Sequence, residues 1–165
     1  MKIYIVAVGN IRESYYKEGV AEYLKRISRF SNIEVIEVKE EKIPENAAEN
    51  ECKKIKAKEA EYINKCISSI QKANRANVVI ALDVGGVVLD SEKFADKING
   101  YMNMGKSTLI FVIGGSLGMD GEFLRNADFR FSMSALTLPH RLARLVLTEQ
   151  VFRAFKILAG ETYHK

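Results

Sequence analysis

The sequence Thr-Leu-Ile-Phe-Val-Ile-Gly-Gly at positions 108–115 is a continuous apolar run of strand length that stops at two glycines. Short apolar runs rich in β-branched and aromatic side chains are typical of strands that are buried on both faces of a sheet. A second run of this kind, at 77–83, leads to Gly85 and Gly86, and we expect these glycines to stop the strand. The two runs predict buried strands of a sheet that is covered on both sides.

Further runs and helical patterns fill the chain around these two strands. Strand-like runs also lie at 3–9, 33–38 and 129–134. The partial alternation within 33–38 favours an edge position. Segments in which apolar residues recur at helical spacing lie at 16–27, 47–73, 91–105 and 139–159. This alternation predicts a single α/β domain, residues 1–165, with a mainly parallel sheet and helices on both faces.

Several helix ends are marked by residues with known capping preferences. Ser91 is expected as an N-cap, because its hydroxyl can accept from the free amides of the following first turn. Gly105 fits the C-terminal cap of the same helix. A short helix is expected after Asp120, and Pro139 suits the first turn of the last helix.

The composition is that of an ordinary globular protein, with 47% hydrophobic and 28% charged residues among 165. No apolar run approaches the roughly eighteen residues of a membrane span, and no leader-like segment follows Met1. We therefore expect a cytoplasmic protein that does not enter a membrane. The formal charge of +4 gives only weak support for an acidic partner. With two histidines and no paired-cysteine motif, no metal site is expected.

The two cysteines, Cys52 and Cys66, fall on one predicted helix. Their spacing of fourteen residues separates them by about 21 Å along a continuous helix. A disulfide needs Cα atoms within about 7 Å, so an internal bridge is excluded. Both are expected to be buried free thiols.

Residues 100–107, Gly-Tyr-Met-Asn-Met-Gly-Lys-Ser, match the pattern G-x-x-x-x-G-K-[ST] of phosphate-binding loops. Such a loop works between a strand and a following helix, where backbone amides and the helix N-terminus surround the phosphates. Here the predicted order is reversed, because the pattern closes a helix and precedes a strand. We interpret it as a helix end and reject a nucleotide-triphosphate site.

Glycine-rich or Ser/Thr-rich segments follow three predicted strands, at 82–86, 113–118 and 132–140. Ligands of open α/β sheets bind at the carboxyl ends of strands. Each segment alone has a simpler interpretation, in which glycines turn the chain and Ser, Thr or Pro caps a helix. Together, at the ends of consecutive strands, they favour a flat, adenine-like ligand held by the backbone.

Four segments are specific enough to identify a family. They are Phe-Val-Ile-Gly-Gly-Ser-Leu-Gly (111–118), Phe-Ser-Met-Ser-Ala-Leu-Thr-Leu-Pro-His (131–140), Glu-Gln-Val-Phe-Arg-Ala-Phe (149–155) and Gly-Glu-Thr-Tyr-His-Lys (160–165). In this order they resemble the ribosomal RNA large subunit methyltransferase H family, a branch of the SPOUT methyltransferases. The resemblance spans the chain. It implies a trefoil knot near the C-terminal end, S-adenosylmethionine as the cofactor, and a homodimer.

The resemblance also implies cofactor contacts. Carried across position by position, these fall on Leu82, Gly114, Met133, Ser134, Ala135, Leu136, Thr137 and Leu138. Met133 and Leu136 differ from the residues that the family usually has, but both keep an apolar wall. The assigned residues lie in the three strand-end segments described above.

The implied reaction is methylation of N3 of pseudouridine 1915 in 23S rRNA, within the assembled ribosome. The imide N3–H is protonated at neutral pH, so catalysis needs alignment with the methyl carbon and either proton removal or stabilisation of the imide anion. No metal is required. Arg144 is predicted to stabilise that anion, because it lies four residues after His140 on the same side of the last helix. The alternative is a solvated helix residue. His140 itself is expected to pack and hydrogen bond near the helix start.

The tail, residues 162–165, carries Tyr163 and His164. We predict that it closes over the pseudouridine, with Tyr163 packing on the ring and His164 placing or accepting a proton. The alternatives are a tail without function and a tail that only packs against the knot. Just before the tail, Glu149 and Arg153 have the spacing of a helical ion pair.

The apolar residues of the last helix cover more than one stripe, which suits burial against both the sheet and a partner subunit. The alternative is a helix enclosed by its own domain. Two other functions stay open at this point. A non-catalytic RNA-binding module would fit the basic C-terminal region, and a nucleotide-triphosphate enzyme rests on the rejected loop. Binding of S-adenosylmethionine, of neither ligand, or of ATP with magnesium would separate the three.

Overall fold

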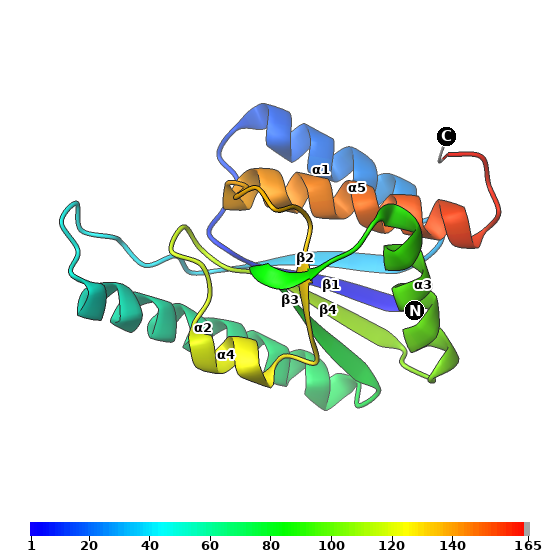
Figure 1. Ribbon diagram of the computed structural model, residues 1–165. Coiled ribbons are helices and arrows are strands. Elements are labelled where there is room, and N and C mark those ends of the chain that lie inside the picture. The colour runs from blue at the N-terminus through cyan, green and yellow to red at the C-terminus, as the bar shows by residue number, and fades with distance from the viewer. Residues whose placement is uncertain (164–165) are drawn as a thin grey trace.

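The computed structural model describes residues 1–163, in which strands and helices alternate along the chain (Figure 1). The strands are β1 (Lys2–Val8), β2 (Asn32–Val38), β3 (Asn77–Val88), β4 (Thr108–Ile113) and β5 (Phe129–Ser132). The helices are α1 (Ser14–Ile27), α2 (Glu49–Ala73), α3 (Ser91–Asn103), α4 (Gly121–Asn126) and α5 (His140–Leu158). Every expected strand and helix is present, including the short helix α4 after Asp120.

The strands form one parallel sheet in the order β2-β1-β4-β3-β5. Strand β4, which contains the buried run, lies in the middle, and all six of its residues are buried. Strand β2 lies at one edge, as the alternation in 33–38 predicted. Because every pairing is parallel, all carboxyl ends of the strands lie along the same edge of the sheet.

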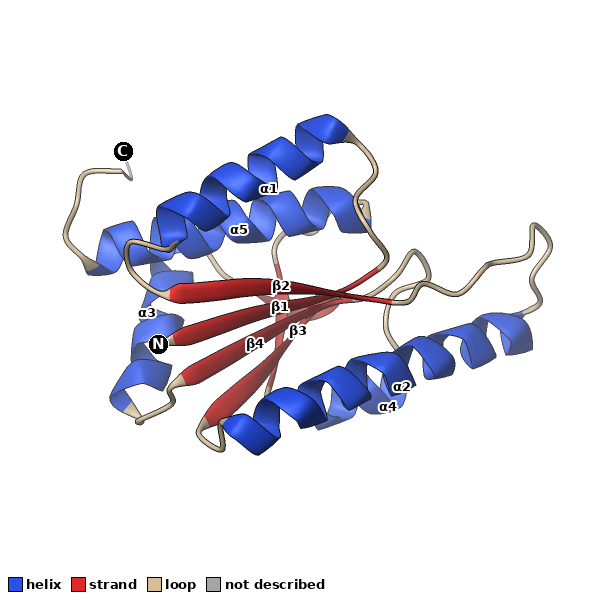
Figure 2. Ribbon diagram, turned by 180° about the vertical axis from the view of Figure 1, so that it is seen from behind, coloured by secondary structure: helices blue, strands red, loops and turns tan. Residues whose placement is uncertain are grey.

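Helices cover both faces of the sheet, as predicted. Helices α1, α3 and α5 pack on one face, and α2 and α4 on the other (Figures 1 and 2). Side chains of β1 alternate between the two layers, with Ile5 in the cluster that contains Leu147 of α5 and Val6 in the cluster that contains Ile63 of α2. This alternation is what the period of two in a strand requires.

The expectation that Gly85 and Gly86 stop the strand is wrong. Strand β3 continues to Val88, and both Leu82 and Val87 pair with Phe131, so the residues between them form a bulge. A Cβ atom on Gly86 would lie 2.7 Å from the backbone carbon of Arg130. The glycine therefore permits close approach of β5, and it does not end the strand.

The caps of α3 and α5 also differ from expectation. Asp90 is the N-cap of α3 and accepts a hydrogen bond from the Lys93 amide at 2.7 Å, while Ser91 is the first helical residue. The Ser91 hydroxyl donates to Gln150 of α5 instead. Pro139 occupies the N-cap position of α5, one residue before the predicted place. Gly105 follows α3 with φ +74°, as its expected role as a cap requires.

Two further sequence interpretations are confirmed. The segment 100–107 closes α3 and leads into β4, so it lacks the strand-to-helix order that a phosphate loop needs. Helix α2 is unbroken between Cys52 and Cys66, and both cysteines are free, although they are half-buried and not buried as expected. Burial raises the pKa of the Cys66 thiol.

Residues 133–139 carry the chain from β5, at the edge of the sheet, back to α5, which packs against α1 and α3. This return path lies across the carboxyl ends of the inner strands (Figure 1). The resemblance assigns a trefoil knot to this part of the chain, and that knot stays a prediction.

Candidate active site

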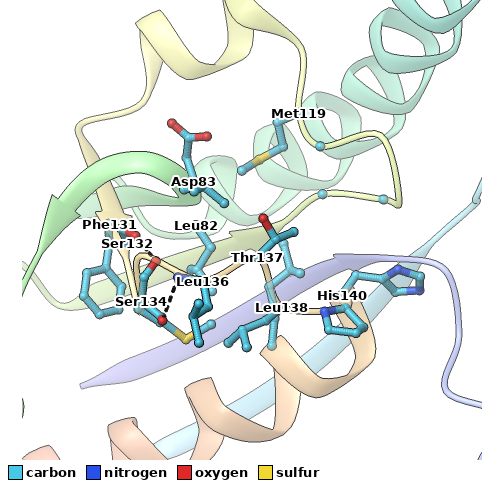
Figure 3. Close-up of a pocket in the computed structure, with 18 of the residues that line it drawn as sticks. Leu82, Asp83, Met119, Phe131, Ser132, Ser134, Leu136, Thr137, Leu138 and His140 are labelled. Carbon is cyan, nitrogen blue, oxygen red and sulfur yellow. Dashed lines mark hydrogen bonds between the residues drawn. The ribbon is translucent and has the colours of Figure 1, made fainter.

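A cavity of about 530 Å³ opens at the carboxyl ends of β3, β4 and β5 (Figure 3). This volume is in the range of small-molecule sites. Its walls come from the bulge of β3, the loop after β4, the loop after β5 and the first turn of α5. The three strand-end segments that stand out in the sequence are therefore brought together at one place.

Seven of the eight residues assigned to the cofactor line this cavity. They are Leu82, Gly114, Met133, Ser134, Leu136, Thr137 and Leu138. Ala135 is exposed and does not line it. The loop after β5 thus faces the cavity along most of its length, and Ala135 is the exception.

Glycines shape the β4 side of the cavity. A Cβ atom on Gly114 would lie 2.7 Å from Cγ of Met119, and one on Gly115 would lie 2.8 Å from the carboxylate of Glu59. Gly118 adopts φ +78° and its amide donates to the Gly115 carbonyl at 3.0 Å, which closes the turn. The glycines therefore let residues 114–119 fold tightly against one another and against Glu59, which shapes the cavity wall at the end of β4.

Side-chain hydrogen bonds hold the loop after β5 in shape. The Ser132 hydroxyl donates to the Ser134 carbonyl at 2.9 Å, and the Ser134 hydroxyl accepts from the Leu136 amide at 2.9 Å (Figure 3). The Leu136 side chain is 74% exposed. An exposed leucine on an ordered loop beside a cavity offers an apolar surface to a ligand.

Sequence reasoning did not assign a role to Asp83, which lines the cavity from the bulge of β3. Arg130 of β5 donates two hydrogen bonds to Oδ2 of Asp83, from Nε at 3.0 Å and from Nη2 at 2.5 Å. The pair ties β5 to the bulge and fixes the carboxylate at the cavity wall. The available signal was a carboxylate directly after an apolar strand.

His140, the first residue of α5, also lines the cavity. Its Nδ1 lies 3.4 Å from the Ser116 hydroxyl, so the ring takes part in a hydrogen bond near the helix start, as predicted. Within residues 1–163 its buried Nε2 has no hydrogen-bond partner. Burial lowers the pKa of His140, which favours the neutral ring at neutral pH. An unpaired polar atom at a cavity fits a site that receives a ligand.

Arg144 occupies a different environment from the one that its helical spacing suggested. Its side chain is buried, which excludes the alternative of a solvated residue. The guanidinium donates to Glu37 Oε1 at 2.5 Å and to the Gly9 carbonyl at 2.8 Å. It does not line the cavity. Arg144 therefore lies beneath the ends of β1 and β2, beside the cavity and not inside it.

Tyr163 lies at the far end of α5. Its ring contacts Phe152 edge-on at 5.0 Å, the Arg153 guanidinium lies 4.7 Å above it, and its hydroxyl donates to Glu149 at 3.3 Å. Burial raises the pKa of Tyr163 to about 12. Glu149 and Arg153 form the predicted ion pair at 2.5 Å.

Within the described residues Tyr163 does not line the cavity, so the closure of the tail over the pseudouridine stays a prediction. The cavity is at the start of α5, and Phe152, which the Tyr163 ring contacts, lies about 18 Å along the helix from His140. The expected role of His164 lies outside the described residues. Within one subunit, Tyr163 therefore packs on its own helix, and it is not among the residues that line the cavity.

No helix within residues 1–163 is long and apolar enough to cross a membrane. In the same residues, no three His, Cys, Asp or Glu side chains come together in a way that could hold a metal ion.

Comparison with known proteins gives matches over almost the whole chain. Residues 1–164 match the family model described as "Predicted SPOUT methyltransferase". The chain is 50% identical to ribosomal RNA large subunit methyltransferase H of Carboxydothermus hydrogenoformans, and 45% identical to the protein of the same name from Acetivibrio thermocellus. Both alignments extend over 165 residues and cover 100% of each protein.

A solved structure described as a probable methylase family protein from Haemophilus influenzae Rd KW20 shares the fold, with a TM-score of 0.56 and 15% identity. The alignment covers 99% of this chain and 70% of that one. The structural likeness supports the fold alone, while the family match and the two relatives extend over the full sequence. The chain therefore belongs to the SPOUT methyltransferase family, as a member of its ribosomal RNA large subunit methyltransferase H group.

Proposed function

We propose that this methyltransferase transfers the methyl group of S-adenosylmethionine to N3 of a pseudouridine in 23S rRNA. The proposal extends to the assembled ribosome as the substrate and to the cytoplasm as the location. The observation that carries it is the cavity itself, which unites the three strand ends to which the family resemblance assigns the cofactor. The two full-length relatives support the choice of ribosomal RNA.

The residues present fit S-adenosylmethionine. Gly114 and Gly115 line the cavity without side chains, and a backbone wall of this kind suits a planar adenine. Leu82, Leu136 and Leu138 supply apolar walls. When bound, S-adenosylmethionine supplies an electrophilic methyl carbon on a sulfonium centre. The protein must then orient the target base and either remove its N3 proton or stabilise the resulting imide anion.

The groups nearest to the cavity suggest how this is done. The His140 ring, neutral near pH 7, has a buried Nε2 without a partner in residues 1–163 and lies at the cavity wall, where it would orient a polar group of the base. Arg144 is a positioning residue in this proposal, because its guanidinium holds the Gly9 carbonyl and Glu37 beside the cavity. Preorganised contacts of this kind lower the barrier by fixing the base in line with the methyl carbon.

We further propose that the active enzyme is a homodimer in which the tail of one subunit serves the cavity of the other. The position of Tyr163 supports this, because its contact with Phe152 holds it about 18 Å along α5 from His140, where its own cavity lies. Apolar residues of α5 that its own domain only half buries, Leu142 and Val146, would contribute to the contact between subunits. The partner's tail would then supply Tyr163 and His164 to the pseudouridine.

The functions left open by the sequence are less well supported. A non-catalytic RNA-binding module does not account for a cavity walled by glycine backbone, and it conflicts with membership of a methyltransferase family. A nucleotide-triphosphate enzyme would need a phosphate loop, and the matching segment closes a helix instead.

The test is methyl transfer to ribosomes that lack the modification. Purified protein is incubated with these ribosomes and S-adenosylmethionine that carries a labelled methyl group, and the rRNA is digested to nucleosides. The label should appear in a single methylated pseudouridine. Absence of label in rRNA, or calorimetric binding of ATP with magnesium in place of S-adenosylmethionine, would overturn the proposal.

A further inference from the structure

The topology of the sheet creates a second place where a ligand can enter. Strands β1 and β4 are neighbours, but the helix after β1 (α1) covers one face and the helix after β4 (α4) covers the other. The loops that leave the two strands therefore diverge, and a crevice opens between their carboxyl ends. The cofactor cavity lies on the β4 side of this crevice. The cavity assigned to the cofactor does not extend to the β1 side of the crevice.

A cleft of about 590 Å³ occupies that side, at the carboxyl ends of β1 and β2. It is lined by Gly9, Asn10, Arg12, Glu37, Val38, Lys39, Glu40, Glu41, Lys42 and Ile43. Arg144 anchors its floor, because it binds both the Gly9 carbonyl and Glu37. Gly9 follows β1 and has φ +77°. The Glu40 side chain occupies the position that a Cβ atom on Gly9 would take. The cleft is therefore a built feature of the fold.

Two of its carboxylates are neutralised by partners inside the protein. Glu37 pairs with Arg144, and Glu41 accepts a hydrogen bond from the Tyr62 hydroxyl at 2.8 Å. Glu41 also pairs with Lys39 at 3.1 Å and with Lys58 at 3.3 Å. The hydrogen bonds from Tyr62 and Lys39 lower the pKa of Glu41 to about 2.

The cations that remain point to an anionic ligand. Arg12 and Lys42 are exposed, and among residues 1–163 neither has a carboxylate within ion-pair distance of its side chain. The remaining carboxylate, Glu40, is close enough to His140 to act on its pKa, so it belongs to the side of the cleft that meets the cofactor cavity. Among residues 1–163, Arg12 and Lys42 are thus the cations of this cleft that no carboxylate pairs.

We propose that this cleft is the subsite for the RNA strand, with Arg12 and Lys42 contacting the phosphates that flank the target nucleotide. The inference rests on the proposed function. The neighbouring β-strands β1 and β4 lie about 4.8 Å apart. A base that turns out of an RNA strand bound in the cleft would therefore enter the crevice directly beside the methyl donor. Phosphate contacts of this kind fix register and orientation, while the chemistry takes place at the base.

The experiment compares two double variants with equal loss of charge. Arg12→Ala with Lys42→Ala removes the cleft cations. Lys65→Ala with Lys72→Ala removes two exposed lysines from the C-terminal half of α2. For the cleft variant we expect KM for ribosomes to rise by about tenfold or more, and the salt dependence of log kcat/KM to become shallower by about two contacts. Affinity for S-adenosylmethionine and the melting temperature should stay unchanged.

The α2 variant should behave as the wild type in every assay. The inference is overturned if the two double variants give the same KM, or if the cleft variant also loses affinity for S-adenosylmethionine. The charge-conserving pair Arg12→Lys with Lys42→Arg should restore most of the binding, because phosphate contacts depend mainly on charge. Failure of the proposed function would look different, since the wild type itself would then transfer no methyl group to rRNA.

Discussion

The guanidinium of Arg144 on α5 donates to the main-chain carbonyl of Gly9, 135 residues earlier in the chain, at 2.8 Å. Its other hydrogen bond goes to Glu37 at the end of β2. One side chain of the last helix thereby holds the ends of the first two strands together. This arrangement gives Arg144 a measurable role that differs from direct contact with the base.

We predict that Arg144→Lys lowers kcat for methyl transfer by about tenfold or more and lowers the free energy of unfolding by about 1–3 kcal/mol. Lysine keeps the charge but cannot make both hydrogen bonds in the same geometry. Urea unfolding and steady-state kinetics measure the two effects. Arg26→Lys, which alters an exposed arginine that is paired with Glu22 on α1, is the control. Equal behaviour of the two variants would remove Arg144 from the positioning role.

Gly114→Ala should weaken binding of S-adenosylmethionine by roughly tenfold to a hundredfold. The added methyl group would meet Met119 at 2.7 Å and the backbone of Gly118 at 3.1 Å, and overpacking of this degree costs about 1–3 kcal/mol. Titration calorimetry measures the affinity, and circular dichroism checks that the fold persists. Gly100→Ala is the control, because nothing lies within 4 Å of the new atom. Unchanged affinity in Gly114→Ala would take Gly114 out of the site.

The buried Glu59 makes stability depend on pH in a defined direction. Burial raises the pKa of its carboxyl, and the neighbouring Glu40 and Glu41 act in the same sense. The folded state then holds a proton over a range where the unfolded chain has lost it, so stability falls as pH rises above the ordinary carboxyl value. We expect Glu59→Gln, which cannot ionise, to gain stability relative to the wild type as the pH rises above the ordinary carboxyl value.

Urea unfolding at a series of pH values tests this expectation. Glu61→Gln, an exposed glutamate on the same helix, serves as the control and should follow the wild type throughout. Parallel stability curves for Glu59→Gln and the wild type would show that the Glu59 carboxyl does not titrate differently in the folded state.

Deletion of residues 162–165 should abolish methyl transfer and leave affinity for S-adenosylmethionine within a few-fold, because Tyr163 does not line the cavity of its own subunit. Mixing the truncated protein with Gly114→Ala protein should restore part of the activity, since one subunit then supplies an intact cavity and the other an intact tail. If mixing restores nothing while each variant still dimerises in sedimentation, the tail does not act across subunits. Loss of cofactor binding on truncation would make it structural.

Assembled ribosomes with the pseudouridine already formed should be methylated much faster than a naked, unmodified transcript of the same rRNA. A small enzyme offers little surface to an isolated RNA helix, so the ribosome has to present the target nucleotide. Label incorporation into the two substrates at equal concentration measures the preference. Equal rates would contradict it.

The strands and the location of the site could be predicted because both depend on local composition. Apolar runs such as 108–113 have to be buried, and ligands collect at the carboxyl ends of parallel strands. The errors arose where distant residues decide the local structure. Gly85 and Gly86 lie inside a strand because β5 approaches them closely. The sequence of residues 77–88 alone does not predict that contact.

Two side chains show the same limit at a finer scale. Asp90 and Ser91 are both good N-caps, and Ser91 loses that role because its hydroxyl reaches Gln150 on α5. Helical spacing placed Arg144 on the same side as His140, which is correct, but a long guanidinium side chain reaches past the cavity to Gly9. Spacing along a helix gives a direction, and only the tertiary structure gives the end point.

The pairing of Lys2 with Thr108 has a consequence for how the chain folds. Strand β1 emerges first during synthesis, yet its inner neighbour β4 follows only after α3, well into the second half of the sequence. Contacts so distant in sequence make folding slow, because the entropy of closing a long loop is lost before the contacts form. The edge of β1 that pairs with β4 therefore stays unpaired during synthesis until β4 has been made.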